Sequence, residues 1–129
     1  MRRRNEAGRN SKAIGVETAS RYNAVSESEI RGSAIMEQVL EASIQFAAGD
    51  REAALRKAAA AGEAEDNMVF EFGPPTTVKP AWEAAGELLI EAGKYREAAD
   101  AFRHALKRYP NRRLSNEGLK RAAESMALR

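Results

Sequence analysis

The residues best suited to chemistry in this sequence are one histidine and several carboxylates. His104 is the only histidine among 129 residues, and the chain contains no cysteine. A catalytic histidine needs a nucleophile or an orienting acid nearby, and no aspartate lies at a spacing that suggests such a partner. The acidic run that ends at Asp66 lacks the glycine-punctuated oxygen spacing of a calcium loop. We therefore expect no catalytic residue, no metal site and no cofactor, with His104 on the surface.

A set of glutamates is the second candidate for function. Glu83, Glu87 and Glu91 follow one another at four-residue steps, so on a helix they lie on one face. Such an acidic ridge has two interpretations. It either prefers a basic segment of a partner, or it is a solvated helix face partly neutralised by Lys94 or Arg96.

Basic residues gather in two regions. Residues 1–12 carry five basic residues and one acidic residue, a net charge of +4. Residues 1–25 have several glycines and few large apolar residues, so we expect a flexible basic arm. The second region, residues 107–121, makes nucleic-acid binding the alternative function, although the helix dipole alone favours cations near a helix end. Its basic residues are Lys107, Arg108, Arg112, Arg113, Lys120 and Arg121.

The composition favours a helical fold built on close packing of small side chains. Aromatic residues make up only 6% of the chain, and alanine is abundant. Ser26 and Glu29 have the spacing of a capping box, which predicts a helix start. Gly49 ends this helix, and Gly62 is interpreted as the stop of the next, so residues 26–66 form a hairpin. The first helix carries apolar and small residues at three- and four-residue steps: Ile35, Met36, Val39, Leu40, Ser43, Ile44 and Ala47.

The second half of the chain predicts another hairpin and a last helix. Residues 67–79 contain Gly-Pro-Pro and are expected to form a loop. Pro80 suits the first turn of a helix. A hairpin over residues 80–110 with its turn at Gly93 follows, and then a capping helix over residues 113–128.

The 80–110 hairpin carries a specific motif. Its residues resemble the tetratricopeptide repeat (TPR), with Ala85 and Leu89 where leucine and tyrosine are usual. Residues 26–66 resemble a degenerate repeat. The whole arrangement is similar to the carboxy-terminal end of longer bacterial TPR proteins of unassigned function. The repeat-defining residues are Trp82, Gly86, Leu89, Gly93, Ala98, Phe102, Ala105 and Pro110.

The resemblance implies an all-α fold of antiparallel hairpins stacked as a short α-solenoid, and a non-catalytic protein–protein interaction function. In this family a concave groove holds a peptide or helix of a partner. The family's lysine and asparagine clamp for a terminal carboxylate corresponds here to Glu83 and Glu87, which would repel such a ligand. The candidate groove residues are Glu83, Glu87, Ile90 and Glu91.

Two further expectations concern the setting of the protein. No stretch approaches the length of apolar residues that a membrane helix needs, and no apolar signal core is present, so we expect a cytoplasmic protein. About three repeats are usually needed for a continuous core, and this chain supplies two and a last helix. Three alternatives would explain the missing repeat. The arm adds a helix, or the chain forms a homodimer through the exposed face of its first hairpin, or the chain is a shortened form of a longer array.

Overall fold

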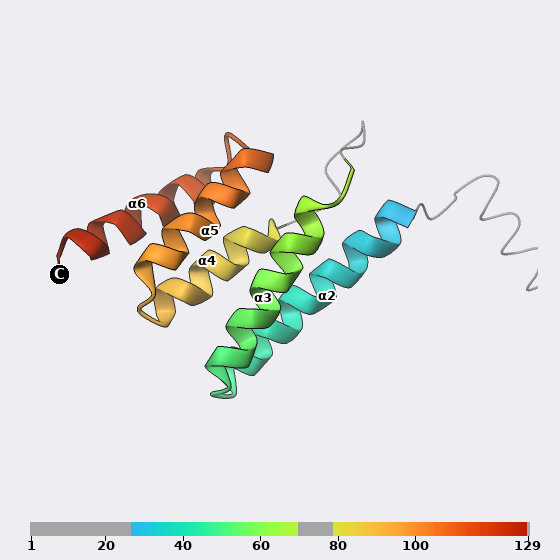
Figure 1. Cartoon of the computed structure of the whole chain (residues 1–129), viewed down its shortest axis with the longest axis horizontal. Helices are drawn as coiled ribbons and strands as arrows, with labels where there is room; N and C mark the ends of the chain where they lie inside the picture. Colours follow the sequence, from blue (N-terminus) through green and yellow to red (C-terminus); the bar gives the residue numbers. More distant parts are fainter. Residues whose placement is uncertain (1–26, 70–78, 129) are drawn as a thin grey trace, which may run out of the picture.

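The computed structural model describes residues 27–69 and 79–128, and throughout these residues the regular elements are helices. They are α2 (Glu27–Ala47), α3 (Arg51–Asp66), α4 (Ala81–Glu91), α5 (Tyr95–Arg108) and α6 (Arg113–Ala127). Figure 1 shows them arranged side by side in chain order, with α2 and α6 at the two edges. The prediction of an all-α protein is confirmed. The predicted arm of residues 1–25, Ser26 and residues 70–78 of the predicted loop lie outside the described residues.

Two glycines reverse the chain between consecutive helices. Gly49 and Gly93 have φ values of 99° and 76°, a left-handed conformation that residues with a Cβ rarely adopt. The amides of Asp50 and Lys94 then donate to carbonyl oxygens five residues earlier, at 3.1 and 2.9 Å. Both helices therefore end in the same glycine-dependent motif. Gly93 is the position at which the sequence pattern predicts a turn, and α4 ends just before it.

Alanine is the commonest buried residue between the helices. Consecutive helices pack against one another along the whole row. Small side chains allow the helix axes to approach closely, as the composition predicts. The buried alanines are Ala42, Ala54, Ala58, Ala61, Ala81, Ala84, Ala85, Ala98, Ala99, Ala101, Ala105 and Ala122.

Among the described residues, Phe102 is the largest fully buried side chain, and it lies where three helices meet. It projects from α5 towards a glycine on each neighbouring helix, Gly86 of α4 and Gly118 of α6. A Cβ atom at position 86 would lie 2.7 Å from Phe102 Cζ, and one at position 118 would overlap the same ring. Because these two residues have no side chain, the phenyl ring can occupy the space beside the backbones of α4 and α6.

Gly62 does not end a helix, so this part of the prediction is wrong. Helix α3 continues through Gly62 to Asp66. A Cβ atom at position 62 would overlap the indole of Trp82. The glycine is needed because the tryptophan of α4 packs directly on the α3 backbone, which is a contact between helices and leaves no local sequence signal.

Helix α2 presents apolar side chains on two opposite sides. Its buried side carries Ile35, Val39, Ala42 and Phe46, which face α3 and α4. Leu40 and Ile44, which the sequence places in the same amphipathic stripe, are exposed. In the described ranges, no helix combines the length and apolar character required to cross a bilayer.

The contact of the Phe102 ring with Gly118 predicts that alanine substitutions at Gly118 and Gly32 have opposite effects on stability. Gly118→Ala forces a methyl group into the buried ring and should lower the free energy of unfolding by about 1–3 kcal/mol. Gly32→Ala is the matched control, since a Cβ there meets only Met68 Cε at 3.9 Å. It should raise the free energy of unfolding by about 0.5–1 kcal/mol through helix propensity. Urea denaturation measures both, and equal effects of the two substitutions would contradict the role assigned to Phe102.

Candidate functional site

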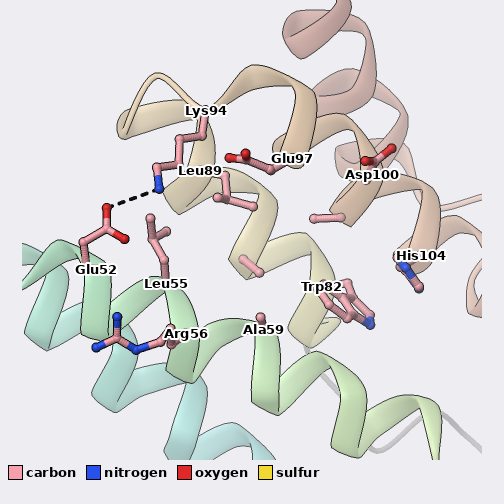
Figure 2. Close-up of a pocket in the computed structure, with 12 residues that line it drawn as sticks. Glu52, Leu55, Arg56, Ala59, Trp82, Leu89, Lys94, Glu97, Asp100 and His104 are labelled. Carbon is pink, nitrogen blue, oxygen red and sulfur yellow. Dashed lines mark hydrogen bonds and ion pairs between the residues drawn. The ribbon is translucent and has the colours of Figure 1, made fainter.

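An open groove runs along α4 between α3 and α5 (Figure 2), with a volume of ≈ 370 Å³. Its floor is apolar and consists of Leu55 from α3 and Trp82, Ala85 and Leu89 from α4. The three α4 residues are spaced three and four apart and form one stripe of that helix. Both α3 and α5 pack against α4, so they act as the two walls. Charged or titratable residues line the walls: Glu52, Arg56, Lys94, Glu97, Asp100 and His104.

Trp82 holds one end of the groove together. Its Nε1 donates a hydrogen bond to Asp66 Oδ2 at 2.7 Å, and its ring stacks on His104 with centroids 4.6 Å apart. His104 Nδ1 lies 3.5 Å from the same Asp66 oxygen. The three side chains come from α4, α3 and α5, so they tie the walls to the floor. Sequence reasoning missed the Asp66–His104 contact because the two residues lie on helices far apart in the chain.

An ion pair marks the other end of the groove. Lys94 Nζ, at the start of α5, lies 3.2 Å from Glu52 Oε1 on α3, and the pair spans the two walls (Figure 2). The Glu52 side chain is exposed and that of Lys94 is partly exposed, so the pair contributes little to stability. Its effect is to place opposite charges beside Leu55 and Leu89, where they frame the apolar floor.

The predicted groove residues occupy a different hollow, between α4 and α6. Glu87, Ile90 and Glu91 line a space of ≈ 360 Å³ together with residues of α5 and α6. Glu87 also accepts a hydrogen bond from Lys79 at 2.8 Å. Three of the four predicted residues are therefore brought together. The residues opposite them are Phe102, Leu114, Glu117, Gly118 and Arg121.

Glu83, the fourth predicted groove residue, is fully buried, so its assignment to an exposed acidic ridge is wrong. Its Oε2 accepts hydrogen bonds from Ser115 Oγ at 2.5 Å and Arg112 Nε at 3.0 Å. Its Oε1 accepts from Arg112 Nη2 at 3.1 Å and Lys79 Nζ at 3.2 Å. Both carboxylate oxygens are occupied by these hydrogen bonds, which join α4 to the start of α6. It cannot contact a partner.

The Glu83 cluster has a direct effect on protonation. Burial by itself raises the pKa of Glu83, but the hydrogen bonds from Arg112, Ser115 and Lys79 outweigh burial and hold its pKa below the usual value. The same contact with Glu83 raises the pKa of Arg112. Glu83 is therefore a charged structural residue at neutral pH.

Glu65 is a second buried carboxylate and belongs to the acidic run that ends at Asp66. It is 3% exposed, and its Oε1 accepts a hydrogen bond from the Ala81 amide at 3.1 Å. Burial raises the pKa of Glu65, while that hydrogen bond and the charge of Arg108 oppose the rise. The side chain caps the first turn of α4 and joins it to α3.

The basic region of residues 107–121 is largely engaged within the protein. Arg108 Nη2 donates to the carbonyl oxygen of Met68 at 3.1 Å, and Arg112 binds Glu83. Arg113 and Lys120 lie 3.7 and 3.9 Å from glutamates one helical turn along α6. The contact with Glu83 neutralises the charge of Arg112, whereas the exposed pairs of Arg113 and Lys120 reduce the positive charge of this region only weakly.

The described residues do not suggest a metal centre. Across residues 27–69 and 79–128, no group of three or more histidine, aspartate or glutamate side chains is placed to hold an ion. Comparisons with protein-family models, curated proteins and solved structures found no match. The TPR resemblance therefore rests on the sequence pattern.

The Glu83 cluster predicts a large and pH-dependent stability effect. Glu83→Gln removes the charge that Arg112 and Lys79 face and should lower the free energy of unfolding at pH 7 by about 3 kcal/mol. Because the folded-state pKa lies below the usual 4.5, the contribution is present above pH 4.5 and disappears as the pH falls through the folded-state pKa. The wild-type and variant unfolding curves should then converge in acid.

Glu87→Gln is the matched control, since it lies one turn further along α4 and is exposed. It should change the free energy of unfolding by less than about 0.5 kcal/mol. Chemical denaturation followed by circular dichroism between pH 2.5 and 7 measures both variants. Equal changes in the free energy of unfolding at positions 83 and 87 would show that the buried cluster contributes no more to stability than an exposed glutamate does.

Proposed function

We propose that the protein is a non-catalytic protein–protein interaction module of the TPR type, and that the groove between α3 and α5 holds a helical segment of a partner. The observation that carries this proposal is the open groove with charged walls, whose apolar floor exposes part of Trp82 and Leu89 beside the buried Leu55. Concave apolar surfaces with a few polar groups at the edge are the usual form of binding sites. An amphipathic helix laid on such a floor would bury its apolar side chains.

Several structural positions support the TPR type. Gly93 lies at the turn between α4 and α5 with a positive φ. Ala98, Phe102 and Ala105 are buried on the face of α5 that meets its neighbours. In this proposal α2 and α3 form the degenerate repeat, α4 and α5 form the standard repeat, and α6 is the capping helix of a short solenoid.

The groove between α3 and α5 is a better helix site than the hollow between α4 and α6. Carboxylates dominate the hollow, where Glu87 and Glu91 face Glu117. The groove instead offers a stripe at positions 82, 85 and 89, which matches the three- and four-residue spacing of anchors on a partner helix. Glu97 of α5 projects over the groove beside Leu89 (Figure 2). We therefore propose that the partner helix carries a basic residue next to the apolar side chain that contacts Leu89.

Nucleic-acid binding stays the alternative function. It rests on the basic arm, which lies outside the described residues, and on residues 107–121, where four of the six basic side chains have partners within the chain. The cytoplasmic location also stays a prediction.

A selection of displayed peptides tests the proposed function. A library of random 15-residue peptides should yield enriched sequences on the wild-type protein, with apolar residues at helical spacing. Ala59→Arg places a long side chain in the groove wall from a position that is only partly buried, and it should abolish this enrichment. Ala60→Arg is the matched control on the neighbouring exposed position and should leave it unchanged.

The only tryptophan of the chain reports binding directly. Trp82 lies in the groove floor, so an enriched peptide should change its fluorescence on titration into the wild type and the Ala60→Arg variant, with no change in Ala59→Arg. Absence of enrichment on the wild type, or equal binding by the Ala59→Arg variant, would overturn the proposal.

A further inference from the structure

Side-chain contacts between α3 and α5 bound the groove at both of its ends. At one end, Lys94 of α5 lies 3.2 Å from Glu52 of α3. At the other end, His104 of α5 lies 3.5 Å from Asp66 of α3. The apolar floor on α4 lies between these two contacts. The groove is therefore a short seat with walls and ends, and only the part between the two contacts is open to an apolar partner.

The apolar floor offers a small contact area to a partner helix. Leu89 follows Trp82 by seven positions on α4, a length of about 10 Å, or two turns of a helix. Both side chains are only partly exposed, while Ala85 between them and Leu55 on α3 are buried. Because apolar contact is limited, charges at the edge of the floor have a large share in deciding which helix binds.

The two walls carry opposite charges beside this floor. Arg56 is exposed on the α3 wall, and Glu97 is exposed on the α5 wall. Across residues 27–69 and 79–128, neither of them has an ion-pair partner. Asp100 adds to the negative charge of the α5 wall, since its pair with Arg103 is exposed and weak. The ion pair at one end of the groove has no net charge.

We propose that the partner helix carries opposite charges on the two flanks of its apolar stripe, with acidic side chains facing Arg56 and basic side chains facing Glu97. This inference rests on the proposed function, because it concerns the same groove. Turning a bound helix end for end exchanges the walls that its two flanks meet. A helix with opposite flank charges therefore matches both walls in one direction and meets like charges in the other. The walls thus select the direction of the bound helix as well as its charge.

Three synthetic peptides of 15 residues test the charge requirement. Each is acetylated and amidated and has leucine at positions 4, 8 and 12 in a background of alanine and glutamine. This leucine stripe is the same when the helix is turned end for end. The mixed peptide carries glutamate at positions 5 and 9 and lysine at positions 7 and 11, which lie on opposite flanks of the stripe. The other two peptides carry lysine, or glutamate, at all four of these positions.

The mixed peptide should bind the full chain about fivefold more tightly than either of the others, because each of these meets a like charge on one wall. Titration calorimetry measures the three affinities, and the differences should shrink in 1 M salt. Equal binding of all three peptides by the wild type, lost in Ala59→Arg, would overturn this inference and leave the proposed function in place. Absence of binding by all three would also overturn it, while the peptide selection would still decide the proposed function.

A nitroxide at either end of the mixed peptide measures the direction of binding. Trp82 is the only tryptophan of the chain and lies at one end of the floor. The two ends of the bound peptide are about 20 Å apart, and a nitroxide quenches tryptophan fluorescence only at short range. One label should therefore quench Trp82 strongly and the other weakly. Equal quenching by the two labels would contradict the selection of one direction.

Exchanging the wall charges should reverse the direction. In the double variant Arg56→Glu, Glu97→Arg, the label that quenches weakly in the wild type should quench strongly, and the other label should quench weakly. The double variant Lys120→Glu, Glu124→Lys is the matched control, since it exchanges an exposed pair on α6 and should behave like the wild type. An unchanged quenching pattern in the groove variant would show that the wall charges do not set the direction.

Discussion

The fit of one phenyl ring between two glycines sets the spacing of the second half of the molecule. Phe102 can lie at the junction of α4, α5 and α6 only because Gly86 and Gly118 have no side chain. Once the three helices are held at that distance, the start of α6 comes against α4. Arg112 then reaches Glu83 there. The buried charge cluster is therefore a consequence of the close approach that the ring and the glycines allow.

The contact between Gly62 and Trp82 repeats this arrangement between α3 and α4. An aromatic ring again rests on a helix backbone where a Cβ would overlap it. Here the ring stays partly exposed, and its polar edge binds Asp66. The groove floor follows from this packing, since Trp82 bridges α3 and α5 and leaves the stripe towards Leu89 open. Trp82 therefore both holds α3 against α4 and forms part of the groove floor that is proposed to bind a partner.

The sequence and the structure assign different work to the two sides of α4. Glu83 corresponds to a ligand-binding position of the TPR family by resemblance, yet its carboxylate is used to hold α6. The side of α4 that faces the groove carries no ionisable side chain on its floor. Charge is consequently concentrated on the walls, and the proposed recognition of a partner relies on apolar contact at the floor and on charge at the edges.

The sequence by itself determined the helical class, the approximate helix bounds and the turn at Gly93, because apolar period, glycine and proline act through the local backbone. It also identified Phe102 and its glycine neighbour on α4 through a spaced motif. Only the tertiary structure decided that Glu83 is buried, that Gly62 lies inside a helix and that Leu40 is exposed. Periodicity shows which residues share a side of a helix. Which side is covered depends on contacts between residues distant in the chain, and these contacts exist only in the folded molecule.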